Sequence, residues 1–199
     1  MNIQNQVLQE YNKATEVLRT LCTIRYGGNA EAKFQKFLQQ FDEILQGVLL
    51  YAALEDHSLC AEEQQILELV HSRGNVLHRI NAQAKYENPD WQDLSLRDLE
   101  TISSAQHDKL NRLIPSALAM AINDFIAAFS EVDLAIASKD YLAEIKEQVM
   151  HISALLAVAD GDMVEDRRAQ QEFSSSISAF TRLIEEYWRP ADTGKYEFD

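Results

Sequence analysis

Hydrophobic residues recur along this chain at intervals of three and four, the spacing that places them on one face of an α-helix. The pattern is clearest at Ile145, Val149, Ile152 and Leu156. It needs no strand, and it predicts helices over residues 3–25, 31–55, 61–87, 94–103, 107–136, 139–159 and 164–188. The expected fold is therefore an all-α bundle of about seven helices.

Turn-forming residues interrupt this pattern at a few points. Residues 26–29 contain two glycines, which tolerate positive φ and can reverse the chain, and the proline within residues 88–90 denies helical geometry to its predecessor. Ser95 and Asp98 have the spacing of a helix N-terminal cap. Pro115 either begins a helix or kinks one. Residues 189–199 lose the apolar period, so we expect a loosely ordered acidic tail there.

Two segments of the chain share a sequence pattern: when the sequence is shifted by 104 positions, residues 48–63 align with residues 152–167. Each has an apolar helix rich in small residues, an aspartate (Asp56 or Asp160), a short turn and an acidic start to the next helix. The pattern predicts two helical hairpins. We therefore expect one domain over residues 1–188, with related halves at about 1–88 and 93–188.

The amino-acid composition argues against several classes of protein. The chain of 199 residues contains 18 Lys and Arg against 32 Asp and Glu, a net charge of −14, without a segregated basic patch. So acidic a surface repels phosphate backbones, which argues against a nucleic-acid partner. Its start does not resemble a signal peptide, and its most apolar stretch, residues 113–129, is interrupted by polar residues. These features predict a cytoplasmic protein that is not transmembrane, with Cys22 and Cys60 as reduced thiols.

The acidic residues of the two hairpin turns are the candidates for a binding site. If the turns converge, Asp56, Glu63, Asp160 and Asp162 gather carboxylate oxygens at one end of the bundle. Calcium and magnesium bind through such oxygens, and a cation would relieve the repulsion between them. Each carboxylate also has a structural role open to it: Asp162, for example, has the position of an N-cap. The metal site is therefore one hypothesis beside a purely structural interpretation.

This repeated pattern resembles the tellurite-resistance protein TerB and the TerB-like domains. Asp56, Leu59 and Glu63 match the pattern in the first copy, and Asp160, Gly161 and Met163 match it in the second. His57 and Arg167 depart from it, standing where glycine and glutamate are usual. The resemblance implies two similar helical halves, an acidic face that binds a divalent cation (Ca²⁺ or Mg²⁺), and protein partners. It also implies a role in stress response or tellurite resistance, in membrane-associated assemblies, rather than catalysis.

Two other functions stay open at this point. Glu68 and His71 have the Glu-x-x-His spacing of di-iron carboxylate bundles. Such an oxidoreductase needs a second copy of that motif, and the nearest candidate, Gln148 with His151, has an amide in place of the carboxylate. The other alternative is an acidic adaptor that binds protein partners without a metal. No hydrolase, phosphate-loop or dinucleotide motif occurs, so we expect a protein that is not an enzyme.

Overall fold

The computed structural model describes residues 3–54, 61–71, 76–133 and 141–156, and within these ranges the chain forms helices and turns without a strand. The all-α prediction is confirmed for this part of the chain. The α-helices are α1 (Ile3–Tyr26), α2 (Ala30–Ala53), α3 (Ala61–His71), α4 (Val76–Glu87), α5 (Ser104–Asp133) and α6 (Tyr141–Leu156). Two short 3-10 helices, η1 (Gly27–Asn29) and η2 (Leu96–Glu100), stand between them.

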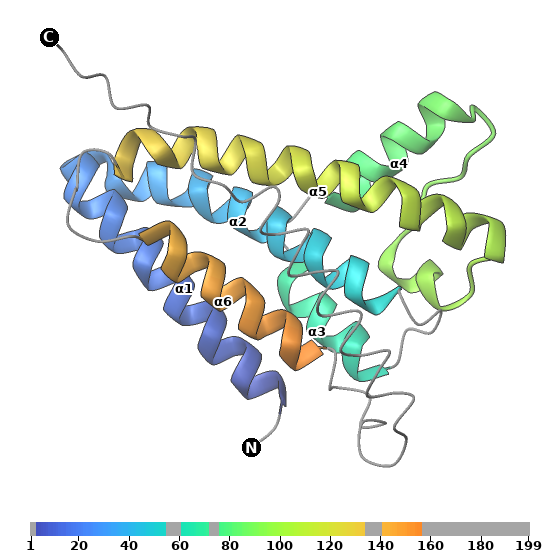
Figure 1. Ribbon diagram of the computed structural model, residues 1–199, viewed down its shortest axis with the longest axis horizontal. Helices are drawn as coiled ribbons and strands as arrows, with labels where there is room; N and C mark the ends of the chain where they lie inside the picture. Colours follow the sequence, from blue (N-terminus) through green and yellow to red (C-terminus); the bar gives the residue numbers. More distant parts are fainter. Residues whose placement is uncertain (1–2, 55–60, 72–75, 134–140, 157–199) are drawn as a thin grey trace, which may run out of the picture.

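Helices α1 and α2 form an antiparallel hairpin, closed by η1 (Figure 1). Gly27 has a φ of 50°, a left-handed conformation that favours glycine, so the predicted reversal at residues 26–29 is confirmed. Across the hairpin, the Tyr11 hydroxyl donates a hydrogen bond of 2.7 Å to Asp42 Oδ1. The Arg19 guanidinium stacks on the Phe34 ring, 3.9 Å from its centroid.

Helix α2 lies at the centre of the bundle, with α1 and α6 on one side and α5 with α4 on the other (Figure 1). Its buried stripe includes Phe41, Ile44, Leu45 and Leu49, all less than 1% exposed. The hydrophobic residues of the described helices join this stripe in one core. A second face of α2 allows close packing at Gly47, because a Cβ there would lie 3.2 Å from Leu118 of α5.

Several predicted elements differ from the observed ones. The helix expected over residues 61–87 is instead two helices, α3 and α4. The turn-forming pair Gly74 and Asn75 lies between them in the sequence. The helix expected over residues 94–103 is only the 3-10 helix η2. Its start is as predicted, since the Ser95 N–H and hydroxyl both donate hydrogen bonds of 2.6 Å to Asp98.

The second half of the described chain consists mainly of α5 and α6. Pro115 lies inside α5, well past its first turn, so the possibility that this proline begins the helix is wrong. Helix α5 instead begins at Ser104, where Ser103 and Gln106 exchange hydrogen bonds in a capping box. The helix predicted over residues 164–188 and the tail over 189–199 lie outside the described residues.

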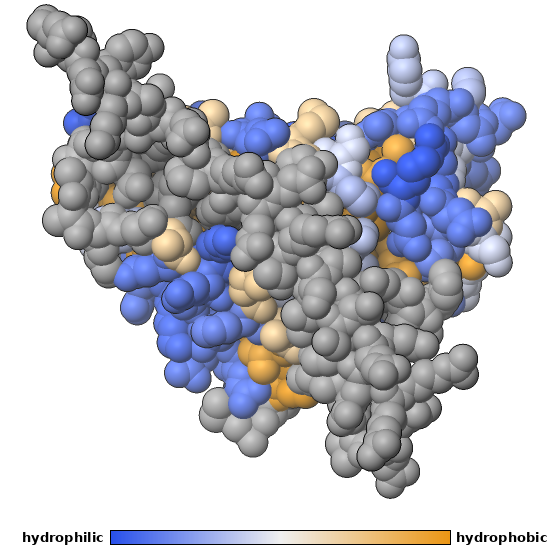
Figure 2. All heavy atoms as spheres, in the orientation of Figure 1, coloured by the Kyte–Doolittle hydropathy of each residue, from blue (hydrophilic) through white to orange (hydrophobic). Residues whose placement is uncertain are grey.

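The surface of the bundle is mostly hydrophilic over α1 and over the end formed by the loop after α4 and the start of α5 (Figure 2). Within the described ranges, no helix is both long enough and apolar enough to cross a membrane. A few large hydrophobic side chains are exposed; Tyr86, at the end of α4, is 91% exposed.

Candidate functional site

Glu63 is the one residue of the four proposed cation ligands that lies in the described part of the chain. It is the third residue of α3, where the sequence predicted it, and its side chain is 5% exposed. A carboxylate in the first helical turn is favoured by the positive end of the helix dipole. Asp56, Asp160 and Asp162 lie outside the described residues, so their positions relative to Glu63 are not described.

The helices that precede the two acidic turns end at the same end of the bundle. Helix α2 runs antiparallel to α1, and α6 does too, so α2 and α6 run in the same direction (Figure 1). Helices α2 and α6 also contact each other. We call the end of the bundle at which α2 and α6 finish the shared end.

Helix α3 contributes to the shared end as well. The side chain of Gln4, at the start of α1, donates a hydrogen bond to Gln65 of α3. Because α1 begins where α2 and α6 finish, this bond places α3, with its buried Glu63, beside the same end. The described ends of α2 and α6 and the helix α3, with Glu63, therefore lie at one end of the bundle.

His107 fixes the end of α2 against the start of α5. Its Nε2 lies 2.6 Å from the carbonyl oxygen of Leu54, the residue directly after α2, and the histidine is 5% exposed. Since a carbonyl can only accept, Nε2 carries the proton. The side-chain amide of Asn111 lies 3.3 Å from Nδ1 and is placed to donate to it. Sequence reasoning missed this residue, because its partner is 53 positions away.

A second buried polar side chain, Gln46 of α2, holds the start of α4. Its Oε1 accepts a hydrogen bond of 2.9 Å from the backbone N–H of Val76, the first residue of α4. The first N–H groups of a helix have no partner within it, so this contact satisfies one of them. Gln46 thereby joins the centre of α2 to α4.

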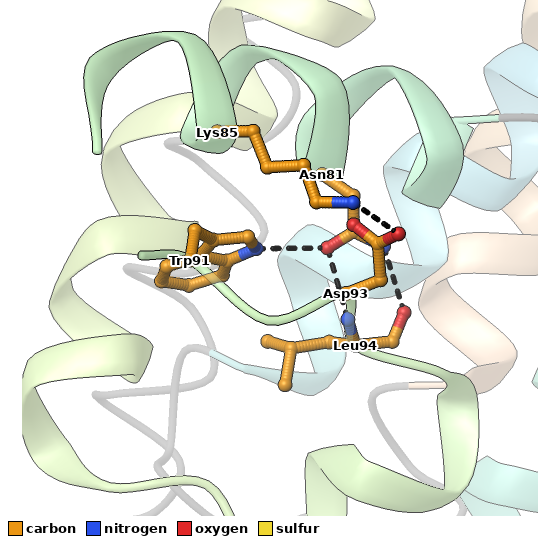
Figure 3. A network of polar contacts seen from close by, with 5 residues as sticks. All are labelled: Asn81, Lys85, Trp91, Asp93 and Leu94. Carbon is orange, nitrogen blue, oxygen red and sulfur yellow. Dashed lines mark hydrogen bonds and ion pairs between the residues drawn. The ribbon is translucent and has the colours of Figure 1, made fainter. Parts of the chain in front are cut away.

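Asn81 of α4 organises the loop that follows this helix (Figure 3). Its Nδ2 donates to the carbonyl of Leu94 at 2.8 Å, and its Oδ1 accepts from the backbone N–H of Leu94 and from the Trp91 indole. Lys85 and Asp93 form an ion pair of 2.6 Å at the rim of this network. The three bonds of Asn81 hold the loop in one conformation, which is a structural role.

Charged residues also meet at the interface of α2, α4 and α5. The buried carboxylate of Glu43 accepts a hydrogen bond of 2.8 Å from Arg79, whose other terminal nitrogen lies 3.5 Å from Asp124. The arginine is partly exposed, and it joins three helices through one side chain. A buried carboxylate with an arginine partner is a stable arrangement, not an unsatisfied charge awaiting a ligand.

The residues of the di-iron alternative do not converge in the part of the chain that is described. Glu68 is exposed on α3, whereas the carboxylates of such a site project into the bundle. His151 is exposed on α6, and its Nδ1 lies 3.5 Å from Glu10 of α1. Among described residues, no group of three or more His, Cys, Asp or Glu side chains could hold a metal ion.

Cys22 lies in the core of the bundle as a free thiol. Burial raises the pKa of this thiol to about 11, so it is protonated near neutral pH and is a poor nucleophile. This agrees with the prediction of a reduced cysteine. Cys60 lies outside the described residues.

The described surface carries shallow depressions that are open to solvent. One, of about 320 Å³, lies between the loop after α4 and the first turns of α5, and Trp91, Gln106 and Lys109 contribute to its lining. Another, of about 370 Å³, follows the outer face of α1 at Arg19 and Ile24. In both, polar surface side chains make up much of the lining.

Comparison with known proteins found no matching family model, no matching curated protein and no matching solved structure.

Proposed function

We propose that this chain is a non-enzymatic, TerB-like helical protein that binds a divalent cation at the shared end of its bundle. The ligands would be the carboxylates of Asp56, Glu63, Asp160 and Asp162. The observation that carries the proposal is that α2 and α6, the helices preceding the two acidic turns, run in the same direction and finish together. Had they run in opposite directions, the two turns would belong to opposite ends.

Chain connectivity supports the same proposal. A residue spans at most about 3.6 Å, so Asp56 lies within about 7 Å of Leu54, and Asp160 within about 14 Å of the end of α6 at Leu156. Neighbouring helix axes are separated by about 10 Å. Connectivity therefore allows both aspartates to reach a common ion, and calcium takes six to eight oxygen ligands.

The buried Glu63 side chain is the second supporting feature. An ionised carboxylate is costly to bury, and a bound cation or a helix N-terminus lowers that cost. Glu63 lies in the first turn of α3, so the helix N-terminus favours its charge, and a cation bound at the shared end would favour it further.

Calorimetric titration of the whole chain with Ca²⁺, Mg²⁺, Mn²⁺ and Zn²⁺ tests the proposal. We expect one site for Ca²⁺ or Mg²⁺, weakened in both D56N and D160N because each removes a charged ligand. D90N is the matched control: Asp90 is exposed in the loop after α4, so its loss leaves the affinity unchanged. A silent titration with all four ions would refute cation binding.

The alternative that a specific observation favours is an acidic adaptor without a metal. Tyr86 is 91% exposed and lies between the exposed Lys85 and Glu87 at the end of α4, and tyrosines are enriched among the residues that anchor protein partners. The charge of −14 suits a basic partner. A silent metal titration, together with partner capture that is lost in Y86A, would favour this function, and the TerB-like role in stress response would then rest on protein contacts alone.

A further inference from the structure

The hydrogen bond between His107 and Leu54 lies where the chain leaves α2. Leu54 is the first residue after α2, its own N–H still bonds to Leu50 at 3.2 Å, and Asp56 follows two residues later. Its carbonyl is one of those that a helix end leaves without a partner inside the helix. The direction in which the chain leaves α2 depends on how this peptide is held.

We propose that His107 is a positioning residue for the end of α2: by binding the Leu54 carbonyl, it fixes the direction in which the chain leaves α2, two residues before the proposed ligand Asp56. The inference rests on the proposed function as far as cation binding is concerned. The fixing of the end of α2, however, is a property of the chain without a metal.

The surroundings of His107 suit this role. The ring is 5% exposed, so water competes little for the bond, and the 2.6 Å separation from Leu54 is short for an N–H···O contact. Asn111, one turn further along α5, approaches the opposite ring nitrogen. Together these contacts set both the orientation and the tautomer of the imidazole, as second-shell partners of metal sites commonly do.

The contact between His107 and Leu54 is supported by the packing of α5, the helix that carries His107, along α2. His107 lies in the first turn of α5, which the Ser103 and Gln106 capping box defines, and α5 packs along α2 through the edge-to-face contact of Phe125 with Phe37. The imidazole is thus attached to a rigid frame that spans both ends of α2. A donor on such a frame holds the Leu54 peptide more firmly than a solvent-exposed side chain could.

Three substitutions at position 107 separate positioning from simple packing. Gln places its Nε2 as many bonds from the backbone as the histidine Nε2, Asn places its amide nitrogen where Nδ1 stands, and Leu fills similar space without a donor. If the bond to Leu54 matters, H107Q retains the behaviour of the natural chain, whereas H107N and H107L do not. H78Q is the matched control, since His78 is exposed on α4.

The first readout is amide hydrogen exchange of the metal-free protein. We expect the Leu54 amide and the last turn of α2 to exchange about tenfold faster in H107L and H107N than in H107Q, while the middle of α1 keeps its protection in each folded variant. Thermal unfolding and helical content, measured in parallel, identify any variant that has not folded. Equal protection of the end of α2 in all four proteins would overturn the inference.

The second readout is the affinity for Ca²⁺ or Mn²⁺. If the natural chain binds the ion, H107L and H107N should bind it roughly tenfold more weakly, the usual effect of losing a second-shell partner, and H107Q within about twofold. Equal affinities in the Gln and Leu variants would contradict the positioning role. If the natural chain binds neither ion, the proposed function fails, and the exchange experiment alone decides whether His107 fixes the end of α2.

Discussion

On the side of α2 that faces α4 and α5, buried polar side chains meet specific backbone groups: Gln46 holds the start of α4, and His107 holds the end of α2. On the other side, α1 and α6 bury mainly apolar residues. The buried Asp42 accepts a hydrogen bond from the Tyr11 hydroxyl there, and the polar contacts of Glu10 with Lys13 and His151 lie near the surface. A buried hydrogen bond requires one particular arrangement of donor and acceptor, whereas an apolar interface accepts the exchange of one apolar side chain for another of similar volume. The difference indicates where the fold is specified.

The same comparison bears on the proposed site. The end of α2, which precedes Asp56, is held by His107, whereas α6, which precedes Asp160, packs on the mainly apolar side. The proposed ligand Asp56 thus follows, two residues after Leu54, a helix end that His107 holds. We expect the loss of the buried polar contacts on the α4–α5 side to be costly and the loss of the near-surface polar contacts on the α1–α6 side to be mild.

The largest effect is expected at Asn81. N81L removes three hydrogen bonds and leaves the buried N–H and C=O of Leu94 without this partner, which should lower the free energy of unfolding by about 3 kcal/mol. Denaturant unfolding measures this loss. N123L on the exposed face of α5 is the control, with an expected change below about 0.5 kcal/mol. Equal stability of the two variants would show that the loop after α4 is not held by Asn81.

An intermediate effect is expected from the Glu43–Arg79 pair. R79M leaves the buried carboxylate of Glu43 without its arginine, at a cost of about 2 kcal/mol, below that of a fully buried pair because Arg79 is partly exposed. The double variant E43L/R79M removes the buried charge as well and should recover much of this loss. Chemical unfolding of the single and double variants provides the comparison, and a double variant less stable than R79M would contradict this interpretation.

The smallest effect is expected on the α1–α6 side, at Glu10. A hydrogen bond from Lys13 is the main cause that holds the pKa of Glu10 below its ordinary value of 4.5; burial acts in the opposite direction, and His151 adds to the lowering. Because the folded pKa is lowered, the stabilisation is present above about pH 4.5 and is lost as the pH falls through the folded value. It should not exceed about 1 kcal/mol.

The stability difference between the natural chain and E10Q, measured from pH 7 down to pH 3, tests this account. We expect the difference to persist down to about pH 5 and then to fade, and to shrink at high salt. E16Q, exposed on the same helix, should show a smaller dependence. A difference that grows as the pH falls below 4 would have the wrong sign for a lowered pKa.

Local features of the fold could be predicted from the sequence, and long-range ones could not. The helical period, the reversal at Gly27 and the cap at Ser95 depend on residues that are close along the chain, and each was confirmed. The break between α3 and α4 was missed because the apolar period continues across it. The extent of η2 was overestimated because its cap resembles that of a longer helix.

In the candidate site, too, only the features that depend on residues close along the chain could be predicted from the sequence. The position of Glu63 near the start of α3 was predictable from the spacing of a helix N-terminus. The contacts of His107 and Gln46 were not, because their partners are 53 and 30 residues away and a buried histidine has no local signature. The common direction of α2 and α6 likewise depends on long-range packing, because both helices lie antiparallel to α1. Only the folded arrangement reveals which helix ends meet.

The distance between the two acidic turns tests the central claim most directly. Spin labels at H57C and G161C, with Cys22 and Cys60 replaced by alanine and with Ca²⁺ present, leave all four proposed ligands in place. Double electron–electron resonance should give a most probable distance below about 20 Å, because ligands of one calcium ion lie about 2.4 Å from it. A distance near or above the length of α2, about 36 Å for its 24 residues, would place the turns at opposite ends and contradict the account.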